Sequence, residues 1–148
     1  GIAAQHYWKY LIDNDFLRDR FGDYPNPFFN FGYGVLLSII ARALVDTGLL
    51  LVLGIFHRNK YNPYCLASDI MEPYRPFVDD LVISTMKKME VSDDLTVALK
   101  REMLSIPVLD VVISGKRSPL MIAAGLTAAS LAKCYNGEVR EISYPSFL

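Results

Sequence analysis

The sequence predicts an all-α fold: one helical, bundle-like domain of about five helices. In most long segments the apolar residues recur at the spacing of one helix face, whereas the alternation typical of strands is rare. Capping residues, prolines and glycines divide these segments into helix-like lengths. With 148 residues, 52% hydrophobic and 21% charged, the chain is long enough for one packed core and too apolar for a disordered segment.

Three predicted helices occupy the chain up to about residue 89. The first covers about residues 2–13, and no capping residue precedes it, which suggests a cut inside a longer protein. A loop marked by "FGDYPNP" leads to a second helix over about residues 28–47, which ends at Gly48. Asn62 and Pro63 have the residue types of an N-cap and a first helical position, so the third helix is predicted from there to about residue 89.

Two further helices are predicted on either side of a short strand. Ser92, followed by acidic residues, is the expected N-cap of a helix that ends before the next proline. The β-branched run "VLDVVI" then predicts a short strand before a turn at Gly115. Ser118 as cap, Pro119 as first residue and Gly137 as stop define the last helix, and the tail after it is predicted to be irregular.

Charge and cysteine content limit the classes of function. The net charge of −1 and the pI of about 6.1 disfavour a free-standing nucleic-acid binder, which is usually basic. Cys65 and Cys134 lack paired zinc-site spacing and no secretory leader is seen, so a cytoplasmic location is expected. The apolar stretch 34–56 is long enough to cross a bilayer, but Arg42 and Asp46 near its middle favour a buried helix instead.

The third predicted helix carries a polar stripe interrupted by prolines. Asp69, Glu72 and Arg75 lie three residues apart, and the simple interpretation is a solvated face with a salt bridge from Arg75. Pro73 and Pro76 lack the N–H groups that would pair the carbonyls of Asp69 and Glu72 in a regular helix. Two freed carbonyls beside two carboxylates would form an electronegative turn that suits a cation; a kink that serves only packing is the alternative.

His57 is a second candidate for metal binding. A lone histidine is more often an orienting or buried side chain, but imidazole combined with carboxylates suits a magnesium- or manganese-type ion. His57 and one carboxylate are too few ligands for a defined site, so a third ligand must come from elsewhere.

Two segments, "NPFFNFGYGVLLSIIARALVDTGL" and "GIFH…DIMEPYRPFVDDLV", carry a family pattern. They contain an Asn–X3–Asn–X–Gly–Tyr stretch, a Gly–Leu turn, a Gly–X–X–His turn and an Asp–X–Met–Glu–Pro–X–Arg–Pro helix. The matching residues are Asn26, Asn30, Gly32, Tyr33, Gly48, Leu49, His57, Asp69, Met71, Glu72, Pro73, Arg75 and Pro76. Together with "GKRSPLMIAAGLTAASLAKCYNG", these segments resemble the C-terminal helical domain of the CRISPR-associated spacer integrase, the Cas-one family.

This resemblance implies a divalent metal, Mg²⁺ or Mn²⁺, held by a glutamate, a histidine and a second acidic residue. The last two correspond to His57 and Glu72. The family's glutamate precedes a Gly–X–Ala–Ala–X–X–Tyr pattern, which "GIAAQHY" matches, so that glutamate is expected immediately before Gly1. Residues 1–148 are therefore expected to be the C-terminal α-helical catalytic domain without the family's N-terminal β domain, and to be inactive by themselves.

The resemblance also implies a function: a metal-dependent DNA endonuclease/integrase of CRISPR adaptation. The 3′-hydroxyl of protospacer DNA would attack a phosphodiester of the CRISPR repeat by transesterification, and the protein would act as a homodimer with the partner protein Cas-two. Asp69 is expected as a second-shell or alternate ligand, and Arg75 as a brace for the carboxylates. Arg58 and Lys60 are candidate DNA phosphate contacts, with a merely solvated loop as the alternative. The histidine-to-carboxylate spacing is similar to that in type II systems.

A second class of function stays open: a helical protein-interaction module without chemistry of its own. The expected absence of the first glutamate and the acidic pI both favour it. Metal binding by the protein discriminates between the two hypotheses.

Overall fold

A computed structural model describes residues 19, 21–23, 25–88 and 97–147. These residues form five α-helices, two short 3₁₀ turns and one two-stranded sheet, so the predicted all-α class is confirmed. The predicted first helix and the predicted cap at Ser92 lie outside the described residues.

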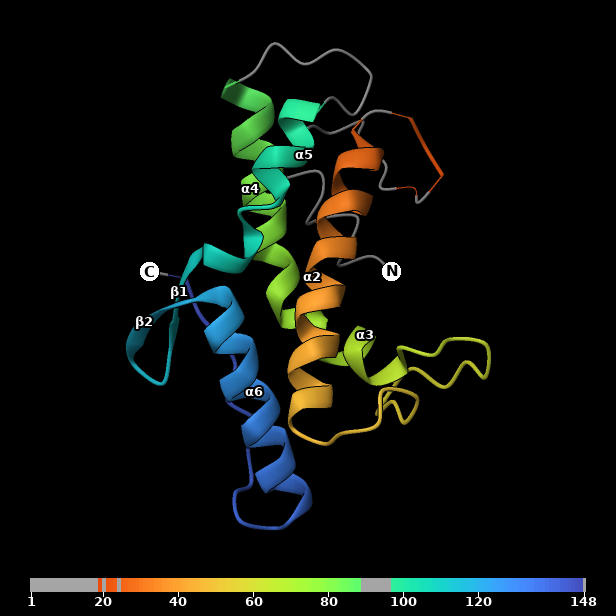
Figure 1. Cartoon of the computed structure of the whole chain (residues 1–148), viewed down its shortest axis with the longest axis vertical. Helices are drawn as coiled ribbons and strands as arrows, with labels where there is room; N and C mark the ends of the chain where they lie inside the picture. The colour runs from red at the N-terminus through yellow and green to blue at the C-terminus, as the bar shows by residue number, and fades with distance from the viewer. Residues whose placement is uncertain (1–18, 20, 24, 89–96, 148) are drawn as a thin grey trace.

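Helix α2 (Asn26–Asp46) runs through the centre of the fold and packs against α3, α4, α5 and α6 (Figure 1). It confirms the second predicted helix and begins two residues earlier than expected. Its core side chains are spaced three or four residues apart, as one helix face requires. They are fully buried and include Phe29, Leu36, Ile40 and Leu44.

The end of α2 is set by Gly48, as predicted. Gly48 adopts a positive φ of 83°, its N–H donates to the carbonyl of Val45, and the N–H of Leu49 donates to the carbonyl of Leu44. These two bonds satisfy carbonyls that the helix leaves free, and a residue with a Cβ would be strained at Gly48.

Helix α2 is also long and apolar enough to cross a membrane by length and composition, and 39% of its most apolar window is buried inside the structure. Its buried apolar side chains belong to the core that it forms with the four helices packed around it. This packing explains why α2 is apolar: it has the composition of a core helix.

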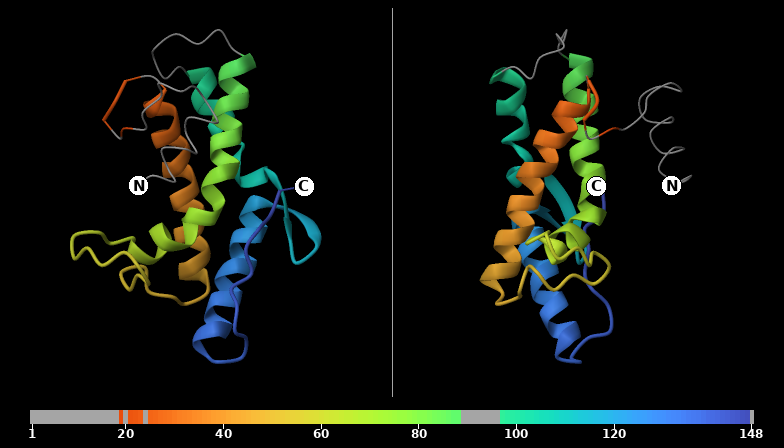
Figure 2. Two further views of the ribbon diagram at one scale, coloured as in Figure 1. Left: turned by 180° about the vertical axis from the view of Figure 1, so that it is seen from behind. Right: turned by 90° about the vertical axis from the view of Figure 1, so that its right-hand side faces the viewer.

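The third predicted helix is two helices joined at an angle. Helix α3 (Cys65–Met71) is followed by the 3₁₀ turn Glu72–Tyr74 and by α4 (Arg75–Lys88), and the chain changes direction at the turn (Figures 1 and 2). The helix starts later than predicted, because Asn62 accepts a bond from the N–H of Tyr64 in a turn ahead of α3.

The prediction that the two prolines leave free carbonyls is wrong. The N–H of Glu72 donates to the carbonyl of Asp69, and the N–H of Arg75 donates to the carbonyl of Glu72. A 3₁₀ turn bonds each carbonyl to the third residue ahead instead of the fourth, so the residue before each proline supplies the donor that the proline lacks. The prolines bend the chain without making an electronegative turn from its backbone.

A hairpin separates the last two helices. After α5 (Val97–Met103) and the 3₁₀ turn Ile106–Val108, strand β1 (Asp110–Ile113) pairs antiparallel with β2 (Lys116–Pro119). The predicted strand is confirmed. Ser118, predicted to cap the last helix, instead lies in β2, where it pairs with Val111 of β1. The two strands can pair because the chain reverses in a tight turn in which Ser114 and Gly115 both adopt positive φ.

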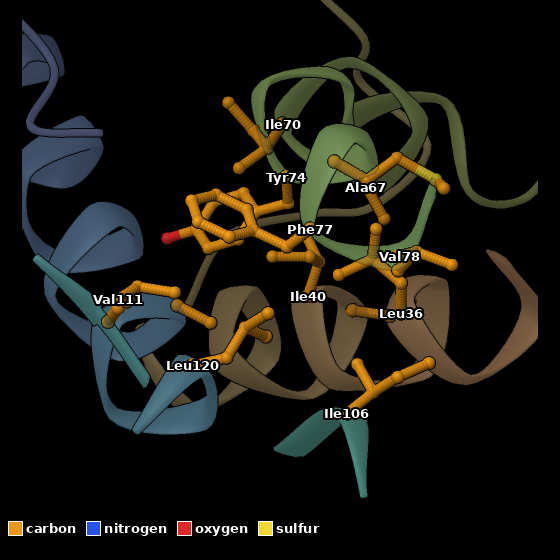
Figure 3. Packing of buried hydrophobic residues seen from close by; sticks show 14 of the residues in the cluster. Leu36, Ile40, Ala67, Ile70, Tyr74, Phe77, Val78, Ile106, Val111 and Leu120 are labelled. Atoms are coloured by element: carbon orange, nitrogen blue, oxygen red, sulfur yellow. The ribbon is translucent and has the colours of Figure 1, made fainter. Parts of the chain in front are cut away.

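Helix α6 (Leu120–Tyr135) packs against α2 and ends at Gly137, as predicted. Three of the six buried residues of α6 are alanines: Ala123, Ala124 and Ala128. Behind it the irregular tail returns to the hairpin, where Ser146 exchanges two backbone hydrogen bonds with Val112. In Figure 3 the labelled side chains of α2, α3, α4 and α6 converge in one core.

Candidate functional site

Asp69 is the organising residue of the candidate site. Its side chain, only 3% exposed, projects from α3 and accepts four hydrogen bonds from the segment Ile55–His57. The N–H groups of Ile55 and Phe56 donate to Oδ2 over 2.5 and 3.0 Å. The N–H of His57 and its ring Nδ1 both bond Oδ1, over 3.1 and 2.5 Å. Three successive backbone amides and one imidazole are therefore folded around one carboxylate.

Gly54 makes this arrangement possible. A Cβ at this position would lie 2.3 Å from the carbonyl oxygen of His57, 2.8 Å from the Cβ of Cys65 and 3.1 Å from Oδ2 of Asp69. The first two distances are shorter than real Cβ contacts, so only glycine lets the segment approach α3 this closely. The glycine and histidine of the Gly–X–X–His turn thus serve the same arrangement. Gly54 lets the segment approach α3, and the approach brings His57 into hydrogen-bond contact with Asp69.

The hydrogen bonds also control the charge of Asp69. Burial by itself raises the pKa of this carboxyl group. The bonds from the His57 side chain and from the N–H groups of Phe56, His57 and Ile55 outweigh burial and hold the pKa below its ordinary value of 3.8. Asp69 is therefore a carboxylate at neutral pH.

The carboxylate of Asp69 determines which nitrogen of His57 is available. An ionised carboxylate can only accept, so neutral His57 carries its proton on Nδ1 and leaves the lone pair on Nε2. The His57 side chain is 46% exposed, while its partner is buried. A histidine fixed by a carboxylate on one nitrogen and open on the other has the arrangement that metal-binding histidines use.

Glu72 begins the 3₁₀ turn that follows α3, three residues after Asp69, which holds His57. Its backbone N–H bonds the carbonyl of Asp69, so the backbone of Glu72 is linked directly to the residue that orients His57. Its carboxylate is 47% exposed, and Oε2 lies 3.2 Å from Nη1 of Arg75, which is itself 41% exposed. The predicted salt bridge is thus present, and Oε1 of Glu72 is not part of it.

The two basic candidates lie on the exposed loop after His57. Arg58 and Lys60 are both exposed. The Nζ of Lys60 lies 4.9 Å from the centre of the Tyr61 ring, a cation–π distance. Both cations are accessible to solvent.

The donor atoms near His57 suit a hard divalent ion in type but not in number. Imidazole nitrogen and carboxylate oxygen are ligands of Mn²⁺ and Mg²⁺. Within residues 19, 21–23, 25–88 and 97–147, no three His, Cys, Asp or Glu side chains form a metal-binding group. Both oxygens of Asp69 already accept hydrogen bonds from residues 55–57, which favours a role as the partner of His57 over a role as a ligand. His57 and Glu72 would be the two ligands that this part of the chain supplies.

A cleft of about 920 Å³, lined by both polar and apolar residues, lies beside the 3₁₀ turn. Amide side chains from α2 and from the loop after His57 line it, together with Tyr33, Ser68 and Arg75; the amides are those of Asn30, Asn59 and Asn62. Asn30 and Tyr33 belong to the Asn–X3–Asn–X–Gly–Tyr stretch. No local sequence pattern predicts that this stretch shares a cleft with the Arg75 region, because the two are far apart along the chain.

The fold and the site define a class of protein: a helical domain in which a buried aspartate holds the segment Ile55–His57 and orients a half-exposed histidine. Comparison with known proteins gives the family. The family model described as "CRISPR associated protein Cas1" matches residues 1–112, and the chain belongs to this family.

Individual relatives agree. The chain is 35% identical over 102 residues to CRISPR-associated endonuclease Cas1 of Neisseria meningitidis serogroup C (strain 8013), which covers 69% of this chain and 33% of the relative. It is 32% identical over 136 residues to CRISPR-associated endonuclease Cas1 2 of Pyrobaculum aerophilum, covering 90% of this chain and 46% of the relative. The chain thus spans between a third and a half of these relatives.

A solved structure shares the fold. The structure titled "Casposase bound to integration product" superposes with a TM-score of 0.75 and 24% sequence identity. The match covers 86% of this chain and 42% of the casposase chain. At this identity the match establishes a common fold.

Proposed function

We propose that this chain is the C-terminal α-helical catalytic domain of a metal-dependent DNA endonuclease/integrase of CRISPR adaptation. The observation that carries the proposal is the arrangement of His57 around Asp69, one hydrogen bond from the backbone of Glu72. A packing role for His57 would not need a half-exposed ring whose orientation is set by a buried carboxylate. Membership of the Cas1 family and endonuclease relatives that are 35% and 32% identical support the same function.

His57 and Glu72 would hold Mg²⁺ or Mn²⁺, with a third ligand from the expected glutamate ahead of Gly1. When bound, the ion would stabilise negative charge on the attacking and leaving oxygens of a phosphodiester. Asp69 keeps the proton of the neutral His57 ring on Nδ1, so that Nε2 carries the lone pair that a metal would bind. Arg75 holds one oxygen of Glu72 and leaves the other for the metal.

The substrates and partners follow from the proposed reaction. The 3′-hydroxyl of protospacer DNA would attack the CRISPR repeat, and Arg58 and Lys60 are exposed where they can contact phosphates. A homodimer assembled with Cas-two, in the cytoplasm, is the proposed working form. Without the expected glutamate the isolated chain would be inactive. The structure titled "Casposase bound to integration product" is consistent with a shared fold for DNA integration.

The experiment uses the full-length protein and measures two quantities in each variant: Mn²⁺ binding, and joining of a DNA fragment with 3′-hydroxyl ends to a repeat-containing plasmid. His57→Ala and Glu72→Gln should abolish joining and weaken Mn²⁺ binding. Glu102→Gln, which changes an exposed glutamate on α5, is the matched control and should leave both unchanged. Joining at the wild-type rate by either site variant would refute the assigned roles.

The non-catalytic interaction module is the second candidate. The observation that favours it is the exposed apolar loop after α2, where Leu50 and Leu53 are 65% and 63% exposed and Phe56 is 85% exposed. Exposed apolar clusters of this kind are typical of protein-binding surfaces. If the full-length protein neither binds Mn²⁺ nor joins DNA, while Leu53→Ser and Phe56→Ser abolish its binding to partner proteins, this second function replaces the first.

A further inference from the structure

Arg75 lies between Glu72 and an aromatic ring. Its Nη1 is 3.2 Å from Oε2 of Glu72, and its guanidinium carbon is 4.8 Å from the centre of the Tyr33 ring. The Nε of Arg75 is buried and has no hydrogen-bond partner within the described ranges. The described contacts that orient this guanidinium are therefore the carboxylate on one side and the face of Tyr33 on the other.

Tyr33 is itself held in place by a buried acid. Its hydroxyl donates a 2.5 Å hydrogen bond to Oδ1 of Asp79, which is only 2% exposed. Tyr33 comes from α2, whereas Asp79 lies on α4, one helical turn beyond Arg75. The bond therefore fixes the ring of α2 against the face of α4 that carries Arg75.

The consequence for Glu72 follows from the geometry of the two charged groups. An exposed glutamate–arginine pair on a flexible surface samples many arrangements, and such a pair contributes little order. A planar guanidinium stacked on an aromatic face loses most of that freedom. Because Tyr33 is bonded to Asp79, the guanidinium has a fixed support, and the carboxylate it bonds takes one preferred orientation.

We propose that Tyr33 and Asp79 are positioning residues for Glu72 and act on it through Arg75. The proposal rests on the proposed function, in which Glu72 binds the divalent ion. It adds that the affinity of Glu72 for the ion depends on a tyrosine 39 positions earlier in the chain and on an aspartate within the core. Groups that hold a metal-binding carboxylate typically change metal affinity by tenfold or more when removed.

The test is Mn²⁺ titration of the full-length protein, with free Mn²⁺ measured by electron paramagnetic resonance. Tyr33→Leu removes both the ring and the hydroxyl and should weaken Mn²⁺ binding by about tenfold. Tyr33→Phe and Asp79→Asn leave the ring in place and should give smaller losses. Tyr74→Phe is the matched control, because it removes a buried hydroxyl bonded to Thr127 in the core; it should lower stability and leave Mn²⁺ affinity unchanged.

A second readout distinguishes positioning from damage to the fold. If Tyr33 acts by positioning Glu72, the DNA-joining rate of Tyr33→Leu should return toward the wild-type rate at saturating Mn²⁺. A rate that stays low at every Mn²⁺ concentration overturns the proposal. Unchanged Mn²⁺ affinity in Tyr33→Leu, with Glu72→Gln strongly impaired, also overturns it and leaves the proposed function standing. Unchanged affinity in Glu72→Gln refutes the proposed function itself, and the positioning role with it.

Discussion

Replacement of Asp69 by Asn removes one of the two carboxylate oxygens around which residues 55–57 are folded. In the native structure Oδ2 accepts from Ile55 and Phe56, and Oδ1 accepts from the backbone and ring of His57. An asparagine side chain has one oxygen and one NH2 group. With the amide nitrogen in the Oδ2 position, the N–H groups of Ile55 and Phe56 both lose their bond. With it in the Oδ1 position, the backbone N–H of His57 loses its bond, and the neutral ring keeps its own only by moving its proton to Nε2.

The size of the effect follows from the number of bonds lost, which is one or two. A hydrogen bond to a charged group contributes about 1.5–3 kcal/mol, so the loss of one or two gives about 1.5–6 kcal/mol. Residues 55–57 are exposed, and their freed N–H groups can bond water, which places the result at the lower end. We therefore expect the free energy of unfolding to fall by about 2 kcal/mol.

Two measurements check this expectation. Urea unfolding followed by circular dichroism gives the change in the free energy of unfolding. Nitrogen-15 NMR at a pH where histidine is neutral gives the position of the ring proton. The chain has two histidines, so a His6→Gln background isolates the signal of His57. The wild-type ring should carry its proton on Nδ1, and the Asp69→Asn variant should populate both nitrogens.

The same data can refute the reasoning. A loss of stability below about 1 kcal/mol, which is the size of a single neutral hydrogen bond, would show that the carboxylate does not hold the segment. An unchanged position of the ring proton would show that Asp69 does not select the nitrogen that His57 offers to a metal. Both results together would remove the structural basis of the proposed metal site.

Three further outcomes are expected. Gly54→Ala places a Cβ 2.3 Å from a backbone oxygen and should lower the free energy of unfolding by about 1–3 kcal/mol in urea. Gly32→Ala places a Cβ 2.6 Å from Cγ1 of Val78 and should lower the free energy of unfolding by a similar ~1–3 kcal/mol. Gly34→Ala places a Cβ with nothing within 4 Å and should stabilise α2 by ~0.5–1 kcal/mol, so thermal melts should shift in opposite directions for the two variants. Because the pKa of Asp69 in the folded protein lies below 3.8, the stabilisation by its carboxylate should be complete above that pH and be lost as the pH falls through the folded pKa. The urea midpoints at pH 5 and pH 3 should therefore differ more for the wild type than for Asp69→Asn. Equal differences in the two proteins would contradict this expectation.

The ends of the helices could be predicted from the sequence because they depend on local backbone chemistry. Gly48 and Gly137 follow the last turns of α2 and α6, and both adopt positive φ. The hairpin was only half predicted. "VLDVVI" has the composition of a strand, but its partner "KRSP" does not, and only the turn at Ser114 and Gly115 brings them together.

The prolines show a different limit. Pro73 and Pro76 were correctly read as an interruption, but the sequence does not say whether the backbone leaves a carbonyl free or tightens to pair it. The backbone at residues 72–74 tightens into a 3₁₀ turn, because such a turn pairs the backbone carbonyls at little cost in free energy. The backbone carbonyls of this turn are therefore not available to a cation, and only its side chains could attract one.

The candidate site was predictable only where its residues are close in sequence or share a motif. Asp69 was placed beside the site as a partner or as a ligand, and its four hydrogen bonds now favour the first role. The bond between Tyr33 and Asp79 joins residues 46 positions apart, and the spacing of neither residue points to the other. Such contacts depend on how α2 and α4 pack, which no local pattern encodes.

The attachment of His57 to α3 also bears on how this protein can vary in length. The imidazole is tied to Asp69, so the exposed residues 58–61 are not needed to fix its position. Insertions or deletions there alter the count between histidine and glutamate and leave the donor atoms where they are. A sequence search that requires one fixed histidine-to-glutamate interval would therefore miss functional homologues. A peptide tag introduced at the same point would leave the side chains of His57 and Glu72 undisturbed.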